Sequence, residues 1–359
     1  MTTVAVLGAG SGGLATTVEL ISAGHSVRLW NRSATTIEPC VRQDGVRFTG
    51  VLGEGEIRPD VMTTSLDEAL SGADVVVVAL PSLVHAAVFA DLVASRWAGP
   101  VILNPGHTGG ALHLRASYLS AGLPLPPTVE FSTLTYVARN ADGLVDVTGR
   151  AGIVRAGALP GGEAALDLAC RLFPGATPVP DVLVSSLSNV NVVLHPPGAV
   201  LGAAWVEATN GDFTFYVQGM TPGVGRVMAA LDEERLAIAR AFGHELPGLA
   251  EEMAAIGTAA PGDEGRTIDD IVRGGTANAR ISAPSSLDHR YYREDLPFGL
   301  VPLLALAGLG GVEAPVATSL LRLGSTAMGA DPLATGLNLQ RLGLEGLTAA
   351  GLMFVVRGM

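Results

Sequence analysis

The chain has 359 residues, of which 48% are hydrophobic and 16% charged, and its formal net charge is −12. Because nucleic acids bind basic surfaces, this acidic balance argues against a nucleic-acid partner. No apolar run approaches the roughly 20 residues that cross a bilayer, and the first residues lack the basic region of a signal peptide. We therefore expect a cytoplasmic protein that binds neither nucleic acid nor a membrane.

The inventory of side chains narrows the chemistry further. The sequence contains no lysine, so all 22 positively charged side chains are arginine, which excludes a Schiff-base lysine and a lysine general acid. The two cysteines, Cys40 and Cys170, match no metal-ligand or redox spacing, so we expect reduced thiols and no metal site. A composition rich in alanine, glycine, leucine and arginine is typical of a GC-rich, bacterial genome.

The first half of the chain alternates strand patterns with helical ones. Short apolar runs occur at residues 3–8, 26–30, 75–82, 99–106, 128–139, 144–150 and 152–159. Helical periodicity follows the first run in residues 11–25, and an amphipathic helix is expected at 161–175. Strands that alternate with helices in this way predict a doubly wound, mainly parallel α/β sheet.

The second half of the chain has a different character, because strand signals disappear after about residue 181. Apolar residues recur at i, i+3 and i+4, which predicts helices at 223–243, 246–257, 267–275, 301–311 and 316–329. A surface loop is expected at 258–266. We therefore predict an α/β domain over 1–183 and an all-α domain over 184–359.

A glycine motif directly follows the first predicted strand. Gly8-x-Gly10-x-x-Gly13 stands between this strand and a helix. Gly8 permits a tight turn, Gly10 lets the backbone approach a pyrophosphate, and Gly13 allows the helix to pack closely on the strand. The start of the helix, at Ser11 and Gly12, then offers free N–H groups to phosphates. In a chain with 46 glycines such a motif can be a turn without a ligand, but its position predicts a Rossmann domain that binds a dinucleotide.

The residues after the second strand bear on the choice of cofactor. An Asp or Glu at this place favours NAD, because its carboxylate accepts both ribose hydroxyls. Here the strand is followed by Asn31, Arg32 and Ser33, so no carboxylate repels a 2′-phosphate and a guanidinium can bind one. We therefore expect NADPH to be preferred. Alternatively, Arg32 is a solvated loop charge and Asn31 still accepts NADH.

Two further segments are expected to contact the cofactor. The run "VVVVALPSLVH" contains Leu80 and Pro81, which turn the chain past the nicotinamide ribose, and its His85 begins the next helix. We expect His85 to be a structural residue or to pack on the cofactor, and not to be the proton donor. Asn104, at the end of the following strand, is a further candidate for a cofactor contact.

Polar residues interrupt the apolar stretch "SSLSNVNVVLHPPGAV" at 185–200. If residues 186–194 are helical, Asn191 and His195 project from one face, one turn apart. Hydride transfer to a carbon requires a proton to be supplied to or withdrawn from the attached heteroatom. Histidine, with an unperturbed pKa of roughly 6.5, suits that task near neutral pH. Alternatively, His195 is an ordinary core histidine.

A second polar group lies in the segment "LDHRYYREDLPFGLVPL", ahead of an apolar helix. Its charged and titratable residues are Asp288, His289, Arg290, Arg293, Glu294 and Asp295. One of these carboxylates can hold His195 in one tautomer and stabilise its imidazolium form, as the third group of a catalytic triad does. Arg290 or Arg293 can receive a substrate carboxylate. Alternatively, the segment is a charged turn that caps the helix, and these residues alone do not single out one carboxylate.

Several motifs together closely resemble the octopine/nopaline (opine) dehydrogenase family over essentially the whole chain. They are "VAVLGAGSGG", "LPSLVHAA", "VILNPGHTGGAL", "NVNVVLHPPG", "FYVQGMTPGVG", "RYYREDLPFGLVP" and "LGLEGLTAAG". The resemblance implies an N-terminal Rossmann domain, a helical C-terminal domain of 6-phosphogluconate-dehydrogenase-like architecture, and an active site between them. It also implies NAD(P)H-dependent condensation of an amine or amino acid with a 2-oxo acid, through an imine that hydride reduces.

The resemblance also implies roles for individual residues. By motif, His195 pairs with Asp295 as the acid/base group, and Asn191 forms a hydrogen bond to the oxo-acid part. His107 and Thr108 in "NPGHTGG", together with Arg293, are weaker candidates for binding a substrate carboxylate.

Two alternatives to an opine dehydrogenase keep the same features. A biosynthetic imine reductase acting on a cyclic or preformed imine would use every residue named above. A non-catalytic regulator that senses NADP could use the same fold, because motifs do not measure turnover. The glycine- and alanine-rich helices of the second half can pack internally or against another subunit, so a homodimer remains open.

Overall fold

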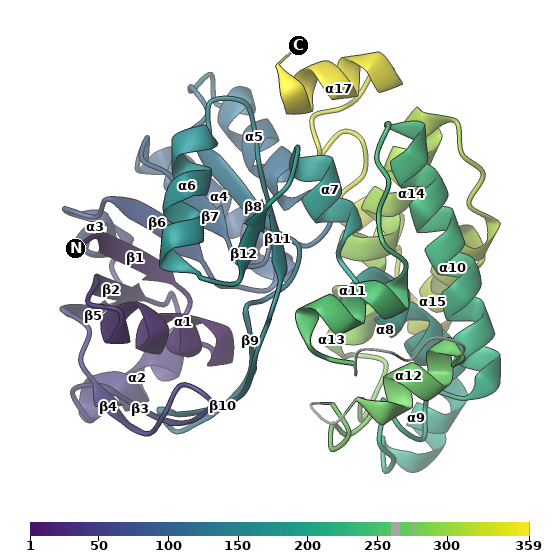
Figure 1. Ribbon diagram of the computed structural model, residues 1–359, viewed down its shortest axis with the longest axis horizontal. Coiled ribbons are helices and arrows are strands. Elements are labelled where there is room, and N and C mark those ends of the chain that lie inside the picture. Colours follow the sequence, from purple (N-terminus) through teal and green to yellow (C-terminus); the bar gives the residue numbers. More distant parts are fainter. Residues whose placement is uncertain (260–265, 276–277, 359) are drawn as a thin grey trace. The chain divides into compact units, whose positions relative to one another are not determined.

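The chain forms two compact units in a computed structural model that describes residues 1–259, 266–275 and 278–358 (Figure 1). The first unit comprises Met1–Gly106 and Leu114–Val182, and the second comprises His107–His113 and Leu183–Met359. The change of unit after Val182 lies beside the boundary that the change in sequence character predicts. The short segment His107–His113, however, belongs to the helical unit, and no shift in composition marks it.

An eight-stranded sheet forms the centre of the first unit, all of whose residues are described. Its strand order is β12-β11-β8-β7-β6-β1-β2-β5. The strands are β1 (Thr3–Leu7), β2 (Ser26–Trp30), β5 (Val61–Thr63), β6 (Val75–Val78), β7 (Val101–Leu103), β8 (Thr128–Phe131), β11 (Val154–Ala158) and β12 (Ala176–Pro178). Each neighbouring pair is parallel except β8 and β11. The expected mainly parallel Rossmann sheet is confirmed.

Helices cover both faces of this sheet. They are α1 (Ser11–Ser22), α2 (Ala34–Arg42), α3 (Leu66–Leu70), α4 (His85–Ala94), α5 (Gly110–Ser120) and α6 (Glu163–Leu172), with a 3₁₀ turn η1 (Ser82–Val84) before α4. Figure 1 shows α1 and α6 in front of the sheet and the fainter α4 and α5 behind it. The four valines of β6 are fully buried, as expected of a β-branched strand that is covered on both sides.

A second, smaller sheet departs from the predicted arrangement. Its order is β4-β3-β10-β9, formed by β3 (Val46–Gly50), β4 (Gly55–Ile57), β9 (Tyr136–Ala141) and β10 (Leu144–Arg150). Strands β9 and β10 form a hairpin whose turn residues Asp142 and Gly143 both have positive φ, the conformation that an Asp-Gly turn favours. Glu19 of α1 accepts a hydrogen bond from Tyr136 and forms an ion pair with Arg150, so this sheet is attached to α1.

The single strand expected at 128–139 is wrong, because the chain bends after Phe131 and the two parts join different sheets. The bend is held by side chains: Asn104 Oδ1 accepts hydrogen bonds from Thr135 N at 3.2 Å and from Thr135 Oγ1 at 2.9 Å. Periodicity could not separate the two strands, because both are apolar and the interruption is only four residues long.

The second unit is helical throughout its described residues, apart from one isolated bridge between Thr214 and Ser282. Its helices are α7 (Val182–Leu187), α8 (Asn191–Leu201), α9 (Ala203–Thr209), α10 (Pro222–Ala241), α11 (Leu249–Ile256), α12 (Ile268–Gly274), α13 (Arg290–Arg293), α14 (Val301–Gly310), α15 (Pro315–Met328), α16 (Pro332–Thr335) and α17 (Ala349–Arg357), with a π-helical turn η2 (Leu296–Leu300). The expected helical domain is confirmed. Most of the loop expected at 258–266 lies outside the described residues.

Helix α10 is the central element of this unit, and it packs against α8, α12, α14 and α15. Its buried Arg235 donates hydrogen bonds to Asp232, to Leu187 O at 2.8 Å and to Pro247 O at 2.9 Å. A buried guanidinium with its charge paired and its donors used stabilises one arrangement of its neighbours. Arg235 thereby fixes the end of α7, directly before the segment that carries the candidate acid/base residues.

Candidate active site

The glycine loop after β1 has the geometry that a dinucleotide pyrophosphate requires. Gly8 has φ 121°, and a Cβ there would lie 2.6 Å from Ala79 O. A Cβ on Gly13 would lie 1.8 Å from Gly8 O, so only glycine lets α1 start this close to β1. A Cβ on Gly10 would meet nothing within 4 Å, which leaves open space at the N-terminus of α1. The free N–H groups of that first turn can bind phosphate there.

Asn31 holds the glycine loop in place. Its Oδ1 accepts a hydrogen bond from Ala9 N at 3.0 Å, and its Nδ2 donates to Ser33 O at 3.0 Å. The side chain is 8% exposed. Asn31, which the sequence suggested as a ribose contact, therefore ties β2 to the loop through bonds within the protein.

The charged residue that follows β2, beside the glycine loop, is an arginine. Arg32 and Ser33 are both exposed, directly after β2. Within the described residues, no ion pair engages the Arg32 guanidinium, and it follows the strand whose end normally reads the adenosine ribose. The residues directly after β2 thus carry a solvent-accessible positive charge and no carboxylate.

The loop after β6 is fixed by a buried histidine. His85 Nε2 lies 3.0 Å from Leu80 O, and its ring packs against Phe89 with centroids 5.1 Å apart. His85 is 2% exposed. These contacts fix Leu80 and the neighbouring Pro81, so His85 supports the turn past the glycine loop.

Asn104 presents an unused donor. Its Oδ1 is occupied by Thr135, whereas its buried Nδ2 has no hydrogen-bond partner among the described residues. A buried amide donor without an acceptor is costly, by about 1–3 kcal/mol. The free N–H of Asn104 therefore fits a ligand oxygen at the carboxyl end of β7, where α/β sheets of this type bind their ligands.

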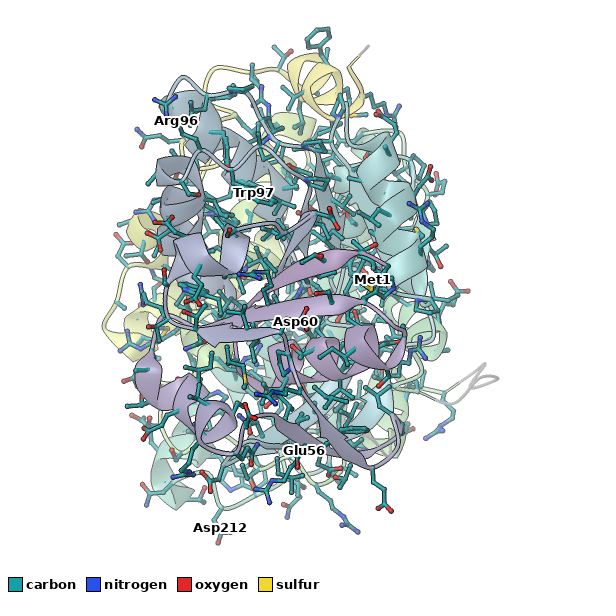
Figure 2. The ribbon with its side chains drawn as sticks, turned by 90° about the vertical axis from the view of Figure 1, so that its left-hand side faces the viewer. Met1, Glu56, Asp60, Arg96, Trp97 and Asp212 are labelled. Carbon is teal, nitrogen blue, oxygen red and sulfur yellow. The ribbon has the colours of Figure 1, made fainter. Side chains whose placement is uncertain are left out.

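The surface cavity at the other end of this sheet is distinct from the glycine loop. Met1, Asp60 and Trp97, labelled in Figure 2, precede β1, β5 and β7, so they mark the amino-terminal edge of the parallel sheet. A cavity of about 450 Å³ there is lined by Trp97 and its neighbours, including Arg96 and Asp67. The glycine loop follows the opposite, carboxyl ends of the strands.

The helix expected at 186–194 is wrong, because the chain breaks between α7 and α8 at residues 188–190. Asn189 accounts for the break: its Oδ1 accepts from Asn191 N at 3.2 Å and its Nδ2 donates to Thr108 Oγ1 at 3.1 Å. An Asn side chain that bonds a nearby backbone N–H competes with helix formation. Asn191 nevertheless begins α8, so it and His195 still share one helix, one turn apart.

His195 has a protein partner on each ring nitrogen. Its Nδ1 lies 2.8 Å from Asp295 Oδ2, and its Nε2 lies 2.7 Å from the Tyr216 hydroxyl. His195 and Asp295 are each 4% exposed. Asp295 comes from the segment between α13 and η2, 100 residues later in the chain. The second unit therefore brings together the histidine and the carboxylate that the family motifs pair.

Aromatic rings surround this pair. The Tyr291 ring stacks near the imidazole with centroids 4.2 Å apart, and the Tyr216 hydroxyl lies 3.4 Å from that of Tyr291. Burial first, then the neighbouring Tyr291 and Asp295, raise the pKa of Tyr216 well above its ordinary value. Sequence reasoning gave Tyr216 no role. The only signal was its place in the "FYVQG" motif, in a chain with five tyrosines.

A second histidine–carboxylate pair is formed by Glu294, the residue directly before Asp295. Glu294 Oε1 is 3.3 Å from His107 Nε2, and Glu294 Oε2 is 3.1 Å from the Arg290 guanidinium. Burial lowers the pKa of His107, against the opposing effect of Glu294 and Asp295. The π-helical turn that follows, closed by the bond from Leu300 N to Asp295 O, lies next to these consecutive carboxylates. Such turns are frequent at functional sites.

The remaining expected substrate residues differ in their surroundings. Thr108 is fully buried, donates to Ser186 O at 3.4 Å and accepts from Asn189, so it positions the α7–α8 break. Arg293 is half exposed and pairs with the exposed Asp288. Arg290 is equally half exposed but pairs with the buried Glu294, which also pairs with His107. Within the described residues, no three His, Cys, Asp or Glu side chains are arranged to hold a metal ion.

Two family models match the chain. Residues 178–328 match the model described as NAD/NADP octopine/nopaline dehydrogenase, alpha-helical domain, and residues 4–103 match the one described as Ketopantoate reductase PanE/ApbA. An opine dehydrogenase of Arthrobacter sp. (strain 1C) is 35% identical over 358 residues, which cover 99% of this chain and 98% of the relative.

A bilayer-spanning helix is not found in the part of the chain that the structure describes.

Solved structures share the fold of the whole chain. Octopine dehydrogenase in complex with NADH and agmatine is similar with a TM-score of 0.79 at 20% identity, covering 100% of this chain and 98% of that one. Yersinopine dehydrogenase with NADP⁺ bound is similar with a TM-score of 0.72 at 16% identity, again covering 100% and 98%. At these identities the likeness shows the fold alone.

Proposed function

The chain belongs to the opine dehydrogenase family and is an NAD(P)-dependent oxidoreductase, and we propose that it joins an amino acid or other amine to a 2-oxo acid. The two condense to an imine, which is reduced to an N-(carboxyalkyl) amine. The observation that carries this proposal is the buried His195–Asp295 pair with its 2.8 Å contact.

Asp295 sets the proton positions on His195. A carboxylate only accepts hydrogen bonds, so Nδ1 of the neutral imidazole carries the proton and Nε2 is left as the basic atom. When Nε2 takes up a proton, the carboxylate stabilises the imidazolium that forms. The pair therefore works as a general base toward a substrate ammonium group and as a general acid toward a leaving hydroxyl.

The reaction requires such a group, because a proton must be removed in one step and supplied in another. An ammonium group must lose a proton before its nitrogen attacks the oxo carbon, and the carbinolamine hydroxyl must gain one before it leaves as water. The bound nicotinamide supplies the hydride that reduces the imine carbon. Histidine is suited to both transfers near neutral pH, and this chain has no lysine to perform them.

The substrate carboxylate is best matched by Arg290. Its guanidinium lies 3.1 Å from Glu294 Oε2 and remains half exposed, so it can bind an incoming carboxylate beside the imidazole. Arg293, one helical turn away, is already paired with Asp288. Asn191 begins the same helix as His195 and is partly exposed, which suits a hydrogen bond to the oxo acid.

For the cofactor, the proposal is a preference for NADPH over NADH. The exposed Arg32 follows the strand whose end carries a carboxylate in NAD-dependent enzymes, and its guanidinium would bind a 2′-phosphate. The glycine loop leaves room for the pyrophosphate, and the buried Asn104 N–H offers a hydrogen bond to the nicotinamide half of the cofactor.

A matrix of amines against 2-oxo acids, with NADPH and NADH in turn, tests this function. Oxidation of NADPH that requires both substrates, with a product mass equal to the secondary amine, is the expected result. Oxidation with a cyclic imine alone would overturn it in favour of an imine reductase. Cofactor binding without oxidation across the matrix would point to a sensor of NADP.

A further inference from the structure

Both ring nitrogens of His195 are occupied by protein groups, and this limits how the ring exchanges protons. Asp295 holds Nδ1 at 2.8 Å, and the Tyr216 hydroxyl holds Nε2 at 2.7 Å. The Tyr291 ring lies against the imidazole with centroids 4.2 Å apart, the Phe215 ring lies edge-on to it at 6.4 Å, and only 4% of His195 is exposed. A substrate atom therefore has no free nitrogen of His195 to meet while Tyr216 stays in place.

The direction of each hydrogen bond follows from the chemistry of the partners. With Nδ1–H donating to Asp295, Nε2 of the neutral ring is an acceptor, so the Tyr216 hydroxyl donates to it. In the imidazolium form, Nε2–H donates to the Tyr216 oxygen, and the phenolic hydrogen is free to point elsewhere. The phenol is thus able to receive a proton on one side and release one on the other.

The surroundings of Tyr216 favour this exchange without a long-lived phenolate. Burial, Tyr291 and Asp295 all raise the pKa of Tyr216, so the phenol gives up its proton only as it takes another. The titratable and charged groups that face or neighbour His195 are Asp295, Tyr216, Tyr291, Glu294, His107, His289 and Arg290.

We propose that Tyr216 relays protons between His195 Nε2 and the substrate, as a further catalytic residue of the proposed reaction, on which this inference rests. In carbinolamine breakdown, the leaving hydroxyl takes the Tyr216 Oη proton as its C–O bond breaks and the nitrogen lone pair forms the C=N bond. Tyr216 Oη takes the proton from Nε2 at the same time. Water leaves, the substrate becomes an iminium ion, and His195 ends neutral.

The deprotonation that precedes condensation is the reverse transfer. An ammonium N–H gives its proton to Tyr216 Oη, while the phenolic proton moves to Nε2. His195 ends as the imidazolium paired with Asp295, and the amine is free to attack the oxo carbon. Each transfer moves one proton onto the phenol and one off it, so no other donor is required.

Substitution of Tyr216 by Phe tests the relay, with Tyr292→Phe as the matched control. Tyr292 neighbours the same cluster in sequence but donates its hydroxyl to Ala199 O at 2.7 Å, away from His195. Tyr216→Phe is expected to lower kcat by about a hundredfold or more, with the affinity for NADPH unchanged, whereas Tyr292→Phe keeps kcat within about threefold of the wild type.

A pH measurement separates the relay from a merely structural hydroxyl. Tyr216→Phe removes the hydrogen bond between Nε2 and the phenol, which is charge-assisted when the ring is an imidazolium. The imidazolium is the form that supplies the proton in carbinolamine breakdown, so the basic limb of kcat is expected to move to lower pH in Tyr216→Phe, whereas Tyr292→Phe keeps the wild-type profile.

Two results would overturn the relay. If Tyr216→Phe keeps the wild-type kcat and pH profile, the hydroxyl takes no part in proton transfer. If the variant has a higher kcat and a lower KM for the amine or the oxo acid, the hydroxyl blocks access of the substrate to His195 Nε2. Should Tyr216→Phe fail to fold, 3-fluorotyrosine at position 216 keeps the hydroxyl but makes it more acidic: a shifted pH dependence of kcat supports the relay, and an unshifted one refutes it.

Failure of the proposed reaction would look different from failure of the relay. If the wild type oxidises NADPH with no pair of substrates, the reaction is refuted. If the wild type forms the secondary amine and Tyr216→Phe does so at the wild-type rate and with the wild-type pH profile, the reaction stands and only the relay is refuted.

Discussion

The glycine loop and the His195 cluster are built on different principles. The loop is formed by residues 8–13, and its function depends on backbone conformation and on the absence of Cβ atoms. The His195 cluster is formed by side chains that are 21 and 100 residues apart in the chain. The loop can therefore be recognised in a short stretch of sequence, whereas the cluster exists only once the helical unit has folded.

The largest expected effect falls on the carboxylate of the cluster. Asp295→Asn keeps the size of the side chain, but the amide no longer enforces one tautomer or stabilises the imidazolium. We expect kcat to fall by about a thousandfold or more, while the affinity for NADPH stays unchanged. Steady-state kinetics and cofactor titration measure both.

Asp288→Asn is the matched control for Asp295→Asn. Asp288 lies in the same segment but is exposed and paired with Arg293, and exposed pairs contribute little. A comparable loss of kcat in both variants would mean that the segment matters as a whole and that the Asp295–His195 contact has no special role.

Arg290 and Arg293 provide the next test of the cluster. A charge-assisted bond to a substrate carboxylate contributes about 1.5–3 kcal/mol, so Arg290→Ala is expected to raise the KM for the 2-oxo acid by tens of fold. Arg293→Ala should change it by less than about threefold, because this arginine is paired at the surface. A larger rise in KM for Arg293→Ala than for Arg290→Ala would show that Arg293 binds the substrate carboxylate.

The glycine loop should respond to Cβ atoms in two distinguishable ways. Gly10→Ala places its methyl group in open space, so the thermal unfolding temperature should stay near that of the wild type while the Kd for NADPH rises about tenfold or more. Gly13→Ala forces a methyl group against Gly8 O, so it should lower stability as well, by about 1–3 kcal/mol. Equal loss of stability in both variants would contradict the open space above Gly10.

The smallest expected effect is that of Arg32 on the preference for NADPH over NADH. Arg32→Ala is expected to raise the KM for NADPH about tenfold, the value of one charge-assisted bond to a 2′-phosphate, and to leave the KM for NADH within about twofold. Equal effects on both cofactors would refute a role for Arg32 in binding the 2′-phosphate. Ser33→Ala, at the neighbouring exposed position, serves as the control.

The difference between the two regions also explains what the sequence could predict. The Rossmann sheet, the helical unit and the glycine loop follow from contiguous patterns. The pairing of His195 with Asp295 came from family motifs, because the residues alone did not distinguish Asp295 from Glu294 or Asp288. In the structure Asp295 forms a hydrogen bond with His195, whereas Glu294 forms ion pairs with His107 and Arg290, and Asp288 forms one with Arg293.

Side-chain hydrogen bonds account for most of what the sequence did not predict. Asn189 breaks the helix between α7 and α8, and Asn104 holds the bend between β8 and β9. Both are polar residues in apolar surroundings, which periodicity treats as interruptions without saying where they bond. Tyr216 was missed for the same reason: nothing in a linear pattern places a phenol on the far nitrogen of a histidine 21 residues earlier.

A single-turnover experiment with His195→Asn tests the central claim most directly. Wild type and variant are mixed with saturating amine, 2-oxo acid and NADPH, and the secondary amine formed in the first turnover is followed by mass. We expect the variant to bind NADPH as the wild type does but to form product at least about a hundredfold more slowly. Product formation in the variant within about threefold of the wild-type rate would contradict an acid/base role for His195.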